Sequence, residues 1–481
     1  MEALLKRYRQ IPQGVKASLW TIVCSVLLKG ISFITLPVFT RLLTTSEYGI
    51  LAIYSSWVSL ISILLTFTVW GGVFNVGMVK YPNRAHFVSA IQGLSVTSVT
   101  TTWFVSLFFL EPLSRWLGIN QFLVICMFVE ILVTIPFNIW LGEQTYDFLY
   151  KKKVIITICM SVLNPLLGYI AIMSFPWHVE AKVFSGLLPQ IVVGVYFFCR
   201  QQSRGKAFFD GKLWRYVLGF NAVLILHYLS TQVLNQSDRI MINFFCDSSK
   251  AGIYSVAYNF AMLLTLVSNG LNASLTSYVY RLMKSGNTGK LAQINTLAIM
   301  LMGGCALILI CIVPDVFRFM LPEEYHEALR IVPPVTLAAY FMFLYPMFGA
   351  IEFYFEINHY VTIASCFGAV LNVALNAVFI PVFGYVAAAY TTLVCYICFA
   401  GSHYYIMNRI LREKHIQEPI YNGAVIAKIS MVISGLCFTV LYVYDQDLYR
   451  WIFIAGIVAI MVWKRRYFRD NLAIIMKKEI S

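Results

Sequence analysis

Apolar runs long enough to cross a lipid bilayer constrain this chain more than any other feature. A bilayer-spanning helix needs about 20 consecutive apolar residues. The runs have approximate cores at 17–40, 49–71, 87–110, 122–142, 154–174, 182–199, 217–244, 252–276, 292–313, 331–351, 360–380, 385–407, 423–443 and 450–463. The sequence therefore predicts an all-α integral membrane protein with about fourteen transmembrane helices. A chain of 481 residues then has no room for a large soluble domain.

The basic residues between these runs predict the orientation of the chain. If the N-terminus is cytoplasmic, 27 of the 36 Lys and Arg residues lie on the cytoplasmic side, seven lie opposite, and Lys29 and Arg239 lie within helices. Cytoplasmic loops carry such an excess. We therefore expect both termini in the cytoplasm. Contact with anionic lipids explains the net charge of +14 without a nucleic-acid partner. The predicted cytoplasmic loop around Glu352 and Glu356 is the exception, because it carries no Lys or Arg.

The eleven cysteines predict neither disulfide bonds nor a metal site. They fall almost entirely within apolar runs, where a free thiol behaves as a small hydrophobic group. Cys395 and Cys398 form a CxxC motif without neighbouring His or Cys residues. We expect no cofactor.

A short motif recurs about two hundred residues along the chain. Thr45–Ile50 (TSEYGI) follows the first predicted helix, and Ser248–Ile253 (SSKAGI) follows the seventh, 203 residues later. Many transporters consist of two related halves. The repeat predicts two pseudo-symmetric six-helix lobes, at residues 1–210 and 211–407, followed by two further helices and a basic cytoplasmic tail at 408–481. We expect a substrate between the lobes.

Two helices carry a stripe of polar side chains on one face. The first has Thr21, Ser25, Lys29 and Ser32, and the seventh has Tyr228, Gln232, Asn235, Arg239 and Asn243. Charges within the membrane are costly and commonly functional. Ser25, Lys29, Gln232, Asn235 and Arg239 are therefore predicted substrate contacts, with the two cations binding an anionic group. Structural pairing or snorkelling is the alternative for those cations.

Glu130 and Asp238 are the acidic residues well inside predicted spans. We expect them to bind a coupling H⁺ or Na⁺. The alternative is a buried ion pair that joins helices, for instance with Lys29. Asn372 and Asn376 lie four residues apart on the eleventh helix, where substrate contact and interhelical hydrogen bonding explain them equally well.

No sequence motif for catalysis accompanies these residues. Residues Gly286–Leu291 fail the ATP-binding pattern G-x-x-x-x-G-K-[ST] in spacing and in the final residue. The acidic loop from Asp315 to Arg330 is short, so a polysaccharide polymerase or glycosyltransferase is a weak alternative. We expect a transporter and no enzyme.

Three segments carry a further signal. The first two run from Lys29-Gly30 to Glu47-Tyr48-Gly49 and from Ser237-Asp238-Arg239 to Tyr258. The third is Leu371-Asn372, Leu375-Asn376, Ile380-Pro381, Gly384 and Ala387-Ala388. Together they resemble the Wzx-type polysaccharide flippases, which share a superfamily with the MATE drug exporters and the lipid II flippases. The acidic stretch from Glu352 to Glu356 departs from the Lys-rich loop expected of the family.

The resemblance implies a MATE-like fold and a bacterial inner-membrane flippase. Such a protein would move an undecaprenyl-diphosphate-linked oligosaccharide to the periplasmic leaflet for O-antigen or capsule assembly. Its partners would include membrane lipids, a polysaccharide polymerase and a chain-length regulator. A MATE-like exporter of cationic drugs is the alternative, although Lys29 and Arg239 would repel such a cargo.

Overall fold

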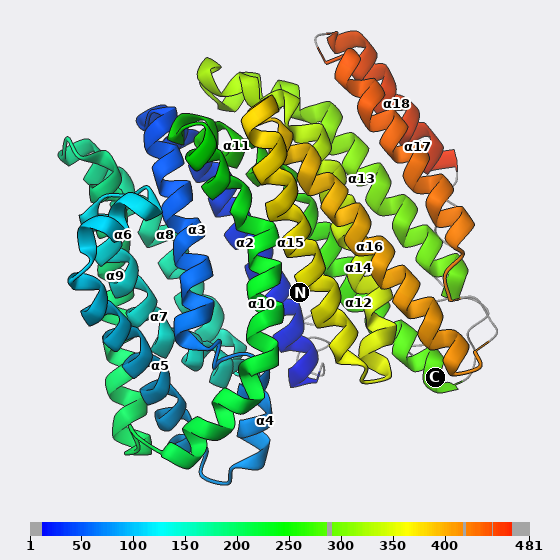
Figure 1. Ribbon diagram of the computed structural model, residues 1–481. Helices are drawn as coiled ribbons and strands as arrows, with labels where there is room; N and C mark the ends of the chain where they lie inside the picture. Colours follow the sequence, from blue (N-terminus) through cyan, green and yellow to red (C-terminus); the bar gives the residue numbers. More distant parts are fainter. Residues whose placement is uncertain (1–11, 286–290, 417–419, 445, 464–481) are drawn as a thin grey trace, which may run out of the picture. The chain divides into compact units, whose positions relative to one another are not determined.

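The computed structural model describes residues 12–285, 291–416, 420–444 and 446–463, and these residues are almost entirely helical (Figure 1). The first ten described helices are α2 (Gln13–Leu42), α3 (Thr45–Thr66), α4 (Gly72–Lys80), α5 (Arg84–Leu107), α6 (Leu110–Leu117), α7 (Gln121–Tyr146), α8 (Tyr150–Ser174), α9 (His178–Gly205), α10 (Gly211–Phe245) and α11 (Ser248–Ala261). The others are α12 (Leu264–Ser285), α13 (Leu291–Met320), η1 (Glu323–Arg330), α14 (Val332–Tyr354), α15 (Asn358–Phe383), α16 (Ala387–Glu413), α17 (Gly423–Tyr442) and α18 (Asp447–Trp463).

Each predicted apolar run matches a helix or a bent pair of helices to within a few residues, and the run at 49–71 continues past the end of α3 at Thr66. Nine of the described helices are long and apolar enough to cross a membrane, and the number rises to twelve if each of three bent pairs forms one span. The helices α16 and α18 cover the two remaining predicted runs. The multi-pass helical membrane protein is therefore confirmed, while the count of fourteen stays a prediction.

The chain divides into two compact units, Met1–Gly252 and Ile253–Ser481. In the first unit α7 packs against α3, α5 and α9, while α8 packs against α2 and α9. A buried amide network joins α5 to α9, in which Gln92 donates to Gln201 at 2.5 Å and Gln202 donates to Gln92 at 2.6 Å. Paired amides keep the cost of burying polar groups low in an apolar interior. The predicted lobe boundaries stay a prediction.

Asp210 lies directly before α10 and caps the start of that helix, outside the membrane-spanning segments. Its carboxylate accepts the backbone N–H groups of Lys212 and Leu213, each at 3.0 Å. His86 Nε2 lies 3.0 Å from the same carboxylate, and this hydrogen bond holds the pKa of Asp210 below its usual value. The first turn of α5 is thereby connected to the start of α10.

In the second unit α14 packs against α12, α13, α16 and α17. Its apolar side chains belong to a large core that includes Tyr340, Phe343, Met347 and Phe399. This packing explains why α14 is among the most buried of the described helices. In its most apolar stretch of 18 residues, 83% of the residues are buried.

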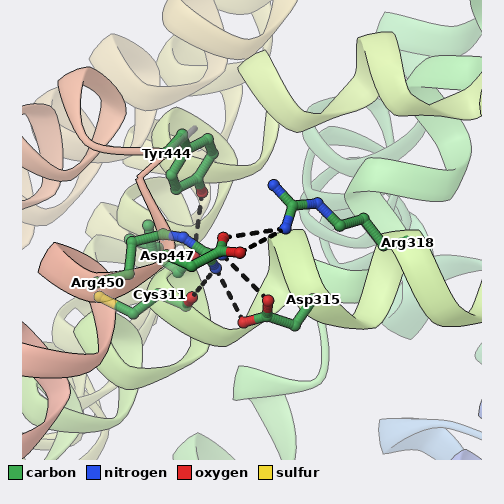
Figure 2. A network of polar contacts seen from close by, with 7 residues as sticks. Cys311, Asp315, Arg318, Tyr444, Asp447 and Arg450 are labelled. Atoms are coloured by element: carbon green, nitrogen blue, oxygen red, sulfur yellow. Dashed lines mark hydrogen bonds and ion pairs between the residues drawn. The ribbon is translucent and has the colours of Figure 1, made fainter.

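A buried arginine holds α18 against α13 (Figure 2). The Arg450 side chain is 1% exposed and donates to both Asp315 oxygens at 2.9 and 3.0 Å. It also donates to Asp447 and to the Cys311 carbonyl oxygen, and Arg318 pairs with Asp447 at 2.9 Å. Several acceptors around one guanidinium offset the cost of burying its charge.

One sequence expectation fails in this unit. We expected Glu352 in a loop, but it lies inside α14 with a fully buried side chain. His403 of α16 supplies the reason, because its Nδ1 lies 2.6 Å from Glu352 Oε1. Glu356, whose φ of 58° is left-handed, follows the end of α14.

Candidate functional site

Glu130 lies at a meeting point of three helices of the first unit. The Tyr54 hydroxyl of α3 donates to Glu130 Oε2 at 2.7 Å, and the Gln190 side chain of α9 lies near the same carboxyl. Lys182, also on α9, interacts electrostatically with Glu130. These partners replace Lys29, which we named as an example of an ion-pair partner and which is exposed on α2.

Lys182 is itself anchored on the neighbouring helices. Its Nζ donates to Asn164 of α8 at 3.1 Å and lies 4.8 Å from the ring centroid of Phe39 on α2. Gly168 of α8 leaves room for the lysine stem, because an added Cβ there would lie 2.5 Å from Lys182 Cδ. One carboxyl and one amine therefore lie near each other among membrane-span candidates of the first unit, and binding of a coupling ion by Glu130 stays a prediction.

The sequence reasoning found Glu130 but missed Lys182 and Gln190. Lys182 stands at the edge of the sixth predicted span, 182–199, and is one of the seven basic residues that the charge distribution assigns to the side opposite the cytoplasm. The contacts that join it to Asn164 and to Glu130 depend on helix packing, which spacing along the chain does not encode.

Some polar residues of α10 form hydrogen bonds within their own helix. Arg239 is buried and donates to the Asn235 carbonyl oxygen and to Gln236 Oε1, each at 2.8 Å. Ser56 of α3 donates to the same Gln236 oxygen at 3.1 Å. Asp238 is fully buried, and Gln232 and Asn235 are partly buried. These contacts are those of the structural alternative for Arg239, and its substrate role stays a prediction.

The polar stripe on α2 is more exposed than the one on α10. Ser25 and Lys29 are exposed, and the hydroxyl of Ser25 donates to the Thr21 carbonyl oxygen one turn earlier at 3.0 Å. Such bonds satisfy the hydroxyl within its own helix. Substrate contact by Ser25 and Lys29 stays a prediction.

Asn372 and Asn376 join α15 to α16. Asn372 donates to Thr392 at 3.3 Å, and Thr391 donates to Asn376. All four side chains are buried. The interhelical alternative therefore describes their contacts, and substrate contact stays a prediction.

The two copies of the repeated motif contact each other. Thr45 bonds with Ser249 at 2.7 Å, and Ser46 bonds with Ser248 at 2.6 Å. Thr45 is equivalent to Ser248 in the repeat, and Ser46 to Ser249, so each hydrogen bond is the symmetry mate of the other. The contact is a local two-fold arrangement.

The glycine of each motif permits this contact. A Cβ at Gly49 would lie 1.7 Å from the Ser248 carbonyl oxygen, and one at Gly252 would lie 2.2 Å from that of Thr45. Glu47 completes a capping box with Thr44 and lies 2.9 Å from His178 of α9. We call residues 44–49 and 248–252 the repeat junction.

Comparisons with known proteins agree with this architecture. Residues 15–269 match the family described as polysaccharide biosynthesis protein, and residues 224–378 match the MatE family. The chain is similar to "Lsg locus putative protein 1" of Haemophilus influenzae, with 23% identity over 264 residues. The match covers 53% of this chain and 63% of that relative, so it spans less than two thirds of the relative's length.

Solved structures share the fold. An inward closed conformation of the lipid II flippase MurJ has a TM-score of 0.69 at 14% identity, covering 92% of this chain and all of that one. An inward-facing MATE-family multidrug resistance transporter of the MOP superfamily has a TM-score of 0.56, also at 14% identity, covering 83% and 96%. The predicted MATE-like fold is thereby confirmed.

Proposed function

We propose a function from the family to which this chain belongs, the polysaccharide biosynthesis protein family. In this proposal the chain is a flippase of the MOP superfamily and moves an undecaprenyl-diphosphate-linked oligosaccharide across the bacterial inner membrane. The movement runs from the cytoplasmic to the periplasmic leaflet by alternating access. Both termini are cytoplasmic in this proposal. A polysaccharide polymerase and a chain-length regulator act on the delivered product.

The observation that carries this proposal is the family match over residues 15–269, which contains the polar stripes of α2 and α10. A diphosphate and a sugar chain cannot cross about 30 Å of hydrocarbon without replacement of their hydration. In the proposal, Lys29 and Arg239 attract the diphosphate. Ser25, Gln232, Asn235, Asn372 and Asn376 form hydrogen bonds with the sugars.

An ion gradient drives the proposed movement. Glu130 supports this role, because its carboxyl accepts a hydrogen bond from Tyr54 and lies near Lys182 inside a membrane span. Asp238 is the second coupling residue in the proposal, since it is an acid fully buried within α10. Either H⁺ or Na⁺ can serve as the coupling ion at such carboxyls.

A MATE-like exporter of cationic drugs is the second candidate, favoured by the MatE match over residues 224–378. The cations Lys29 and Arg239 oppose it, because they would repel a cationic cargo. A membrane-embedded polymerase or glycosyltransferase is a weaker third candidate. The MATE-like fold supports transport, and catalysis forms no part of our proposal.

Deletion of the gene separates the three candidates. A flippase mutant should accumulate the complete lipid-linked oligosaccharide on the cytoplasmic leaflet, because synthesis does not depend on a protein that only moves the product. A transferase mutant would instead accumulate a truncated glycan, and a polymerase mutant a translocated but unpolymerised one. Loss of a drug exporter would leave the glycan unchanged and alter drug sensitivity.

A further inference from the structure

A cavity of about 620 Å³ opens within the first unit, where the ends of four helices meet. The start of α2, the end of α7, the start of α8 and the end of α9 contribute its walls. Ligand sites in proteins typically enclose about 300–1,000 Å³. The cavity is separate from Glu130, which does not line it, and it contains none of the predicted substrate contacts.

The walls of this cavity carry an excess of positive charge. The basic lining residues are Lys16 of α2, Lys151 and Lys152 of α8, and Arg200 and Arg204 of α9. Two acids also line it, and both have partners: Glu143 accepts a hydrogen bond from Gln201 at 3.1 Å, and Asp147 lies 3.6 Å from Arg84. An anion entering the cavity would therefore meet more positive than negative charge.

The start of α8 adds to this charge. The helix begins at Tyr150, and no side chain caps it at Leu149. The first turn of a helix presents backbone N–H groups and a partial positive charge. Lys151 and Lys152 belong to this turn, so the basic side chains and the helix end act on the same space.

Aromatic residues form the apolar part of the cavity. Trp140 and Tyr150 are buried and line it, and the Tyr150 ring stacks on Trp20 of α2 with the centroids 6.3 Å apart. Aromatic rings of this kind commonly lie at the level of lipid headgroups. The helices α2, α7, α8 and α9 are all candidate membrane spans, so their ends are expected near that level.

We propose that this cavity binds the phosphate group of a membrane lipid at the face that the distribution of basic residues predicts to be cytoplasmic. Clustered cations and an uncapped helix end suit a phosphate, while the aromatic wall suits the first carbons of a lipid tail. The phosphate belongs to an anionic phospholipid or to a prenyl diphosphate. The second source rests on the proposed flippase function, for which the cavity would be an early stop of the cargo.

Lipid binding to the purified full-length protein tests the proposal. We would titrate phosphatidylglycerol, undecaprenyl diphosphate and, as a zwitterionic control, phosphatidylcholine, and measure bound lipid by native mass spectrometry. The pocket variant is Lys152→Gln with Arg200→Gln. The matched control is Lys153→Gln with Lys212→Gln, which removes the same charge from neighbouring positions that do not line the cavity.

The pocket variant should bind the phosphate lipid roughly 30-fold more weakly than the wild type, since each basic residue contributes about 1 kcal/mol near a membrane surface. The control should bind as the wild type does. If the pocket variant binds only phosphatidylglycerol more weakly, the phosphate comes from the phospholipid. If it binds only undecaprenyl diphosphate more weakly, the phosphate comes from the prenyl lipid. Equal binding by the pocket and control variants overturns the proposal.

A measurement on the wild type covers the case in which the pocket variant does not fold. A photoreactive phosphatidylglycerol should crosslink to the peptide that contains Lys151 and Lys152, and excess undecaprenyl diphosphate should compete if both lipids use the cavity. Crosslinks confined to other segments would refute the site. Failure here leaves the flippase proposal standing, because leaflet accumulation in the deletion strain tests that separately.

Discussion

At the scale of single residues, Glu130 is the first position to test. Replacement of Glu130 with Gln keeps the shape of the side chain and an acceptor for the Tyr54 hydroxyl, but it removes the titrating group. We expect translocation in vesicles to stop responding to an imposed proton or sodium gradient. Asp238→Asn should act similarly, and Glu111→Gln in α6, an acid paired with Arg115 at an exposed site, is the control.

Gradient dependence that is unchanged in both Glu130→Gln and Asp238→Asn would show that other residues couple transport to the ion. The comparison also separates coupling from packing, because a packing defect would lower the amount of folded protein.

Lys29 gives the cleanest test of cargo charge. Because its side chain is exposed, Lys29→Ala should leave the amount of protein in the membrane normal and strongly reduce surface glycan, which a blot of the glycan measures. Arg41→Ala, on the same helix, is the control. Arg239→Ala should lower glycan too, but Arg239 is buried and hydrogen-bonded, so a loss of protein there would favour its structural role. Wild-type glycan in both variants would exclude the diphosphate contact.

The buried pair of Glu352 and His403 predicts a stability effect. Glu352→Ala should lower the free energy of unfolding by about 1–3 kcal/mol, because it leaves the imidazole without its hydrogen-bond partner in an apolar core. Thermal unfolding of the purified protein measures this, with Glu356→Ala in the exposed turn as control. In a double-mutant cycle with His403→Ala, effects that simply add would contradict direct coupling of the pair.

At the scale of elements, the repeat junction depends on two glycines. Gly49→Ala would place a methyl group on the Ser248 carbonyl oxygen, so the two helix starts must separate and the Thr45–Ser249 and Ser46–Ser248 bonds must break. We expect a loss of thermal stability of about 1–3 kcal/mol and loss of surface glycan. Gly219→Ala in α10 meets no atom within 4 Å and should be neutral or stabilising. A Gly49→Ala protein with wild-type stability would mean that the junction is easily rearranged.

Hydropathy predicts the helices well but misses where they break. The α5–α6 pair bends by 102° and the α11–α12 pair by 41°. Phe108 and Phe109 connect the first pair, and Pro112 in the first turn of α6 has no N–H to bond to the Phe108 carbonyl, so α5 cannot continue straight through this point. Met262 and Leu263 connect the second pair, where no proline or glycine lies at the break and apolar residues continue through it. The second change of direction therefore follows from packing, which an apolar run does not encode.

At the scale of the whole molecule, the sequence predicts the fold better than the site. Runs of apolar residues indicate a multi-pass helical protein because a bilayer leaves few alternatives. The repeat was visible because two motifs share both spacing and helix number. Pairings such as Glu130 with Tyr54, or Glu352 with His403, join positions 76 and 51 residues apart. They depend on which helices are neighbours, and one sequence does not contain that information.

Orientation is the remaining whole-molecule prediction, and labelling can decide it. In a background without the eleven native cysteines, Glu356→Cys should resist impermeant thiol reagents added outside the cell, because the excess of Lys and Arg places its turn in the cytoplasm. Gln446→Cys should react with the same reagents. We use Gln446 because its neighbour Asp445 lies outside the described residues. Both positions are exposed, so burial cannot explain a difference between them.

The turn at Glu356 follows α14 in a segment without basic residues, and three helices, α15, α16 and α17, lie between it and Gln446. An odd number of spans places the two cysteines on opposite sides. Equal labelling at both positions would therefore refute three spans there and the count of fourteen, while reversed labelling would show that this half has the opposite orientation.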